Sequence, residues 1–150
     1  VSVLHGGPFG GVGGTAGVSH EVDRRGDGGA MFRLCTAQNR SAVTGAALMV
    51  KQCLWMKHPG MDKKKFAVAF NDVDFCIRLR DAGLWNVFTP FAQAYHYESK
   101  SRGYDTEGPN KDRFEREAAA FRKKYAELLA NGDPFYNPPP TLQFENYGYK

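Results

Sequence analysis

The segment 66–83 constrains the fold more than any other part of this sequence. An apolar run leads directly into Asn71, a residue type that is favoured at helix N-caps. Asp72 and Asp74 follow in what would be the first helical turn, where free amides and the helix dipole favour carboxylates. Gly83 suits the left-handed position that often ends a helix. We therefore predict a helix that is capped by Asn71 and ends before Gly83.

The two acids of this helix are expected to have different surroundings. Residues two apart point about 200° apart around a helix, so Asp72 and Asp74 cannot both face one site. Asp74 can reach back toward the cap and pair with Arg78 one turn on. Asp72 has apolar neighbours that would adjust its pKa, as a general base needs. At most one of the two acids is therefore expected to be catalytic. A purely structural role at the start of the helix would also explain why both acids occur there.

Composition limits the classes of protein to consider. A chain of 150 residues suits one domain, and a net charge of +4 with a pI of about 9.0 favours anionic ligands such as nucleotide phosphates. That charge is too small to indicate a nucleic-acid partner. Cys35, Cys53 and Cys76 are widely spaced, which indicates reduced thiols. With no apolar run long enough for a membrane span and no signal-peptide pattern, we expect a cytoplasmic location.

Residues 1–40 are predicted to be a Gly-rich, flexible lead-in. Ten of the 17 glycines fall in residues 1–30, where regular structure would be costly. The pattern Gly11-x-Gly13-x-x-Ala16 formally resembles a dinucleotide-binding fingerprint, but no amphipathic helix follows it. A loop is therefore favoured, followed by a short helix or irregular turn over Met31–Arg40.

The remaining elements follow from apolar patterning. Ser41–Val50 is apolar on both faces and predicts a buried strand, with Gly45 marking a close approach by another backbone or a ligand. Lys51–His58 predicts a short helix. Trp85–Thr89 predicts a strand, and Ala92–Tyr97 predicts a second extended segment.

A long amphipathic helix is predicted from Asn110 to the Asn131–Gly132 stop. Apolar residues recur at helical spacing over about 18 residues: Phe114, Ala118, Phe121, Tyr125, Leu128 and Leu129. The tail that follows is rich in proline and aromatics and is expected to lie extended across the domain.

His96 and Glu98 would share one face of the second extended segment. Imidazole and carboxylate are suitable ligands for a manganese-type ion, although an ordinary core histidine fits the position equally well. Trp85 and the tyrosines at 95, 97 and 104 are able to stack on sugar rings, with simple packing as the alternative. Trp55 is expected in the core.

Four segments occur in a characteristic order: Ser41–Val50, Gly60–Asp62, Phe70–Gly83 and Tyr95–Ser99. In this order and spacing they resemble the C-terminal half of a family 2, inverting glycosyltransferase of the GT-A type, close to bacterial rhamnosyltransferase-like members. The resemblance implies an α/β fold, namely a partial GT-A fold. Residues 41–105 would be its acceptor-side half, and residues 106–150 its C-terminal helix and tail.

The resemblance also implies an activity. Such an enzyme transfers a sugar from a nucleotide-sugar donor to a cell-surface glycan acceptor with inversion, assisted by a divalent metal, Mg or Mn. The family's general base corresponds to Asp72, preceded here by Asn71 where the family usually has Glu, and its metal-binding histidine corresponds to His96. Gly45, Asn71, Trp85 and Glu98 are then expected to contact acceptor or donor.

The nucleotide-binding half of that family, with its DxD motif, does not occur in these 150 residues. We therefore expect the chain to be inactive alone and its Gly-rich start to be a linker. The expected partners are the nucleotide sugar and an oligosaccharide, polysaccharide or lipid-linked acceptor, without nucleic acid. Association with the inner membrane face and homo-oligomerisation are compatible with this assignment.

Two other classes of function compete with the glycosyltransferase. A metal-dependent phosphoesterase or nuclease would use four residues: Asp72, Asp74, His96 and Glu98. A non-catalytic glycan-binding domain would instead use the exposed aromatic side chains.

Overall fold

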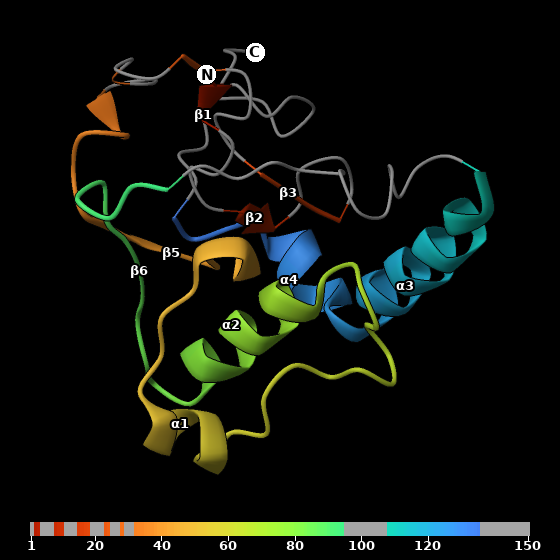
Figure 1. Ribbon diagram of the computed structural model, residues 1–150. Helices are drawn as coiled ribbons and strands as arrows, with labels where there is room; N and C mark the ends of the chain where they lie inside the picture. Colours follow the sequence, from red (N-terminus) through yellow and green to blue (C-terminus); the bar gives the residue numbers. More distant parts are fainter. Residues whose placement is uncertain are drawn as a thin grey trace.

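The computed structural model describes residues 2–3, 8–10, 15–18, 23–24, 28, 32–94 and 108–135. These residues form a mixed structure of helices and small antiparallel sheets, each of two strands, in agreement with the expected α/β class (Figure 1). Among the described helices, none is both long and apolar enough to cross a membrane.

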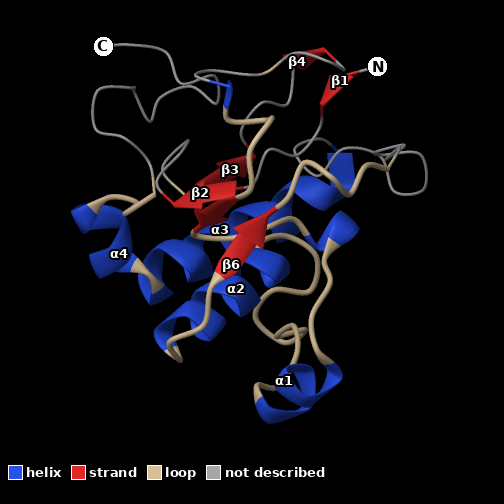
Figure 2. Ribbon diagram, turned by 90° about the vertical axis from the view of Figure 1, so that its left-hand side faces the viewer, coloured by secondary structure: helices blue, strands red, loops and turns tan. Residues whose placement is uncertain are grey.

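Helix α2 (Asn71–Asp81) occupies the centre of this structure. A strand pair, β5 (Gln38–Arg40) with β6 (Asn86–Phe88), lies on one side of it, and α3 (Lys111–Lys124) lies on the other (Figures 1 and 2). The buried Asn86 side chain donates hydrogen bonds to the carbonyls of Ser41 and Cys76, at 3.0 and 2.9 Å. The strand pair is thereby fixed to α2.

The core forms where α2 meets α3. The Phe121 ring lies 5.0 Å from the ring of Phe70, 6.1 Å from that of Phe66 and 4.9 Å from that of Tyr125, measured between centroids. The apolar stripe predicted from the sequence therefore faces the core. The buried residues of this core are Ala42, Phe66, Phe70, Val73, Cys76, Ile77, Ala118, Phe121 and Tyr125.

The ends of α2 agree with the sequence in one respect and differ in another. Gly83 follows the helix with a φ of +82°, as expected of a glycine stop. The N-cap, however, is Phe70 rather than Asn71, and it makes no side-chain capping hydrogen bond. The prediction of an Asn71 cap is wrong because the helix begins one residue earlier, with Asn71 in its first position.

The C-terminal helix is divided in two, which corrects the expectation of one continuous helix. α3 ends at Lys124, and α4 (Ala126–Asn131) follows Tyr125, whose backbone leaves the helical region at φ −114° and ψ 28°. The Tyr125 hydroxyl is fixed by a hydrogen bond to Asp74 on α2. The predicted end of the helix, at Asn131, is confirmed.

Ser41–Val50 is not a strand. Gly45–Ala47 forms a 3₁₀ turn, η3, and the flanking residues are irregular. Side chains take over the hydrogen bonding that a strand partner would supply: the Thr44 hydroxyl accepts the Ala46 amide at 3.3 Å, and the Cys76 thiol accepts the Val43 amide at 3.5 Å.

The other described elements fall close to their predicted places. α1 (Gln52–Lys57) and β6 confirm the short helix and the strand expected there. Residues 32–36 are turns, but β5 follows them within the segment predicted as helix or turn. Trp55 is not in the core: it is 37% exposed and packs against Phe75, with ring centroids 5.0 Å apart.

The first thirty residues contain short strand pairs that the sequence did not predict. β1 (Ser2–Val3) pairs with β4 (Asp23–Arg24), and β2 (Pro8–Gly10) pairs with β3 (Ala16–Val18). A 3₁₀ turn, η4 (Gly108–Asn110), precedes α3. Residues 95–97 of the second extended segment and the tail beyond residue 135 lie outside the described residues.

We predict that Phe121→Ala lowers the free energy of unfolding by about 3–5 kcal/mol, because it opens a cavity between α2 and α3. Phe91→Ala is the matched control, since the Phe91 side chain is 85% exposed and should change stability by less than about 0.5 kcal/mol. Urea unfolding measures both variants. Equal losses would contradict the assignment of Phe121 to the core.

Candidate functional site

Asp72 and Gly45, 27 residues apart in the sequence, are in direct contact. The Gly45 amide donates to Asp72 Oδ2 at 2.7 Å, and the Val73 amide donates to Oδ1 at 2.8 Å. A carboxylate oxygen accepts two hydrogen bonds, so each oxygen retains capacity for one more donor. The half-buried Asp72 carboxylate is therefore fixed in orientation, and it can still accept a proton or a hydrogen bond from a hydroxyl group.

Only glycine fits at position 45 without displacing its neighbours. A Cβ there would lie 3.1 Å from Asp72 Cβ and 3.2 Å from Met61 Cε, closer than ordinary van der Waals contact. The close approach predicted at Gly45 is thus made by the Asp72 side chain. Three of the four ordered segments, those containing Gly45, Met61 and Asp72, meet at this point.

The residue that leads into the Asp72 turn has a strained backbone. Phe70 has φ 61° and ψ 4°, a left-handed conformation that costs a residue with a side chain about 1–2 kcal/mol. Two contacts from α3 offset this cost. Phe121 stacks on the Phe70 ring, and Glu117 Oε2 accepts the Ala69 amide at 2.6 Å and the Val68 amide at 3.4 Å.

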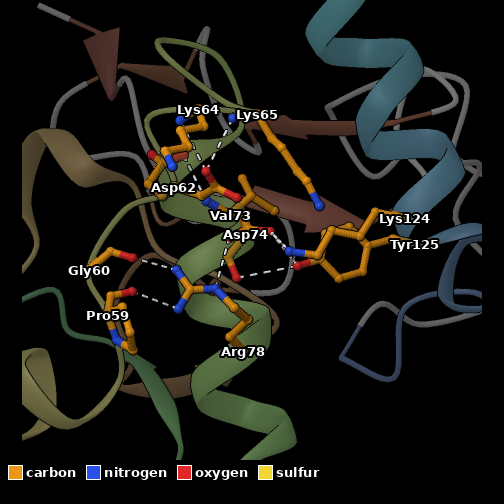
Figure 3. A network of polar contacts seen from close by, with 11 residues as sticks. Pro59, Gly60, Asp62, Lys64, Lys65, Val73, Asp74, Arg78, Lys124 and Tyr125 are labelled. Atoms are coloured by element: carbon orange, nitrogen blue, oxygen red, sulfur yellow. Dashed lines mark hydrogen bonds and ion pairs between the residues drawn. The ribbon is translucent and has the colours of Figure 1, made fainter.

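Asp74 points toward Lys124 and Tyr125, at the contact between α2 and the end of α3 (Figure 3). It is fully buried and accepts hydrogen bonds from Arg78 Nε at 2.9 Å, from the Tyr125 hydroxyl at 2.7 Å and from Lys124 Nζ. Burial acts to raise its pKa, but the bonds from Lys124, Tyr125 and Arg78 together outweigh it and hold the pKa below its usual range. The predicted Arg78 pair is confirmed. The predicted capping role is wrong, because both oxygens are engaged by these donors.

Arg78 connects the hydrogen-bond network around Asp74 to a loop outside the two helices. Its guanidinium also donates to the Pro59 carbonyl at 2.8 Å and to the Gly60 carbonyl (Figure 3). The loop that leads to Met61 is therefore attached to the same network as α3. This attachment places Met61 beside Gly45 and Asp72.

Two other titratable groups near α2 belong to the packing. Burial raises the pKa of the Cys76 thiol to about 11, so Cys76 is neutral at physiological pH and bonds only the backbone of Val43. Burial, followed by the hydrogen bond to Asp74, raises the pKa of Tyr125. All three cysteines are free thiols, with Cys35 and Cys53 exposed.

Among the remaining predicted site residues that the structure describes, Asn71 lies beside Asp72 and Trp85 does not. Asn71 is the neighbour of Asp72 in the helix, but Trp85 follows the opposite end of α2, which spans about 16 Å. Trp85 is 69% exposed and meets Phe135 edge-on at 6.4 Å. His96 and Glu98 lie outside the described residues.

The described residues hold no group of three or more His, Cys, Asp or Glu side chains placed to bind a metal ion. The predicted metal site at His96 therefore stays a prediction, and we derive no reaction step from it.

Sequence patterns missed the residues on α3 and at its C-cap that support Asp72 and Asp74. Glu117 is an acid next to the apolar stripe, between Phe114 and Ala118, and that unusual placement was the available signal. Tyr125 was assigned to the apolar stripe, and nothing in the sequence indicated that its hydroxyl would bond Asp74. Lys124 lies in a run of basic residues that reads as a solvated helix end.

Comparisons with known proteins give two relatives. Over 145 residues, 97% of its length, the chain is 36% identical to the uncharacterized protein y4gI of Sinorhizobium fredii, of which the match covers 16%. Over 113 residues, 75% of its length, it is 33% identical to the O-antigen biosynthesis protein RfbC of Myxococcus xanthus, of which the match covers 8%. The chain thus spans less than a fifth of either relative. No family model and no solved structure matches.

We predict that Asp74→Asn lowers the free energy of unfolding by about 2–3 kcal/mol at pH 7, because it removes the charge that three donors share. The folded-state pKa lies below the ordinary value of 3.8. The carboxylate therefore stabilises the fold above about pH 4, and this contribution is lost as the pH falls through the folded pKa. The difference between wild type and variant should shrink below pH 4 in urea unfolding measured from pH 7 to pH 2.5.

Asp81→Asn is the control for this prediction. Asp81 is an exposed acid on the same helix, and its removal should change stability by less than about 0.5 kcal/mol at any pH. A loss at Asp74 that is no larger than the loss at Asp81, or that persists unchanged at pH 2.5, would contradict the network.

Proposed function

We propose that this chain is the acceptor-side part of an inverting glycosyltransferase that acts in polysaccharide biosynthesis, with Asp72 as its general base. The similarity to an O-antigen biosynthesis protein over 75% of the chain supports the process. The ordered segments that resemble family 2 glycosyltransferases support the reaction type. The chain spans a small part of both relatives, so this proposal concerns a longer protein that contains the region.

The contact between Gly45 and Asp72 is the observation that carries the proposal. It joins two of the four ordered segments at one carboxylate, 2.7 Å from amide to oxygen. A general base must be fixed in orientation and must keep a lone pair for the incoming proton. Asp72 meets both needs. Asp74 does not, because its buried carboxylate already accepts hydrogen bonds from three side chains.

The proposed reaction is a single displacement. The acceptor hydroxyl transfers its proton to an Asp72 oxygen while the hydroxyl oxygen forms a bond to the anomeric carbon of the donor sugar. The bond from that carbon to the nucleoside diphosphate breaks, and the diphosphate leaves with the electron pair. Attack opposite the leaving group inverts the anomeric configuration.

A divalent ion, with His96 as a proposed ligand, would offset the charge that develops on the leaving diphosphate. A nucleotide-sugar donor and a glycan acceptor are the proposed substrates. Gly45 and Asn71, which adjoin Asp72, are the proposed acceptor-side contacts among the described residues.

The competing metal-dependent phosphoesterase has less support. It needs Asp74 as a metal ligand, but Asp74 is fully buried and bonded to Arg78, Lys124 and Tyr125. Releasing it would leave buried polar groups unsatisfied, at a cost of about 1–3 kcal/mol for each group.

We predict that Asp72→Asn lowers the turnover number for sugar transfer by at least about 100-fold in a full-length protein that contains this region, because an amide cannot accept the proton. Transfer from a panel of nucleotide sugars to a polysaccharide acceptor, measured by mass spectrometry of the product, provides the assay. Asp81→Asn, on the exposed end of the same helix, should retain turnover within about 2-fold. Turnover of Asp72→Asn within a few-fold of wild type would show that Asp72 is not the base.

A further inference from the structure

A pocket of about 380 Å³ opens between α3 and the loop that contains Lys64 and Lys65, and Asp72 is not among its lining residues. The pocket is lined by Lys64, Lys65, Arg113, Arg116, Glu117 and Ala120. Four of these side chains are cationic and one is anionic, which leaves a net charge of +3 around one open space. Its volume falls in the range of small-ligand sites, about 300–1,000 Å³.

Two separate elements supply the cations. Arg113 and Arg116 share one face of α3 with Glu117 and Ala120, at helical spacings of three and four residues. Lys64 and Lys65 come from the loop opposite, whose backbone is fixed because Asp62 Oδ1 accepts the Lys64 amide at 3.0 Å and the Lys65 amide at 3.1 Å. Figure 3 shows both lysines leaving this turn near the Asp62 carboxylate.

The one carboxylate in the pocket is already engaged. Glu117 Oε2 accepts the amides of Ala69 and Val68, and its Oε1 lies 3.9 Å from Arg113 Nε. Glu117 is buried, whereas Lys64, Lys65 and Arg116 are exposed. Glu117 thus binds the backbone at residues 68–69, and Arg113 also donates to Asn110 Oδ1 at 3.2 Å. The exposed cations Lys64, Lys65 and Arg116 leave the open side positively charged.

We propose that this pocket binds a small, soluble phosphate compound, with a diphosphate group as its preferred ligand. Guanidinium groups bind two phosphate oxygens at once, and lysine ammonium groups add point charges. A monocarboxylate would use one of the four cations, whereas a diphosphate spreads two to three negative charges over two centres and meets cations on both elements. This inference does not depend on the proposed sugar transfer, because no pocket residue bonds the Asp72 carboxylate and the four cations make no contact with Gly45 or Val73, its hydrogen-bond partners.

Titration of the chain with inorganic pyrophosphate at 150 mM NaCl, followed by amide NMR shifts, tests the proposal. We expect saturable shifts at Lys64, Lys65, Arg113 and Arg116. The triple variant K64Q/K65Q/R116Q should weaken binding at least about 10-fold, since each charge-assisted hydrogen bond contributes about 1.5–3 kcal/mol and 1.4 kcal/mol is a factor of ten. The dispersion of the amide spectrum reports whether each variant is folded.

The matched control removes the same charge elsewhere. Lys51, Lys57 and Lys123 are exposed and lie outside the pocket, so K51Q/K57Q/K123Q should weaken binding by less than about 2-fold. Equal weakening by both triple variants would overturn the proposal, because it would show attraction by net charge alone. No saturation up to about 10 mM would also overturn it. So would binding to phosphatidic acid vesicles in the absence of pyrophosphate binding, which would make the pocket a lipid headgroup site.

Discussion

The structure depends on a carboxylate that is buried in the contact between two helices. Removing a charge from water costs several kcal/mol, and only good geometry with further hydrogen bonds offsets that cost. Asp74 satisfies this condition through Arg78, Lys124 and Tyr125, which come from both helices. The same requirement fixes the packing of α2 on α3, since a shift of either helix would leave the charge with too few donors. Arg78 extends the constraint to the carbonyls of Pro59 and Gly60.

This constraint also gives the two neighbouring acids their different roles. With Asp74 held toward α3, the geometry of the helix turns Asp72 toward the loop at Gly45. The backbone strain at Phe70 lies between this turn and the preceding segment, where Glu117 and Phe121 hold it in place. Strained residues persist only where the surrounding structure over-determines them, and they are often found beside functional groups. The contacts of α3 therefore support the residues that lead directly into the candidate site at Asp72.

Patterning predicted the elements whose stability comes from burying one face. The stripe from Phe114 to Leu129 located the C-terminal helices, and the acids with Gly83 located α2. The predicted strand at Ser41–Val50 failed because apolar composition does not reveal that Cys76, Thr44 and Asp72 side chains bond this backbone. Gly45 gave the useful signal for the candidate site, as a position of close approach. The interruption of the helix at Tyr125 and the bond from Lys124 to Asp74 both depend on how α2 packs against α3. A local sequence pattern contains no information on that packing.

We propose that one acid of α2 acts in chemistry and the other acts in structure. The most direct test is the turnover of Asp74→Asn in a full-length protein that contains this region, measured at a temperature where unfolding curves show that the variant is folded. We expect a turnover number within about 3-fold of wild type for each folded molecule, because Asp74 is bonded to Arg78, Lys124 and Tyr125 and does not join the Asp72 contact. A loss of about 100-fold or more in the folded variant would place both acids in the reaction and contradict this division of roles.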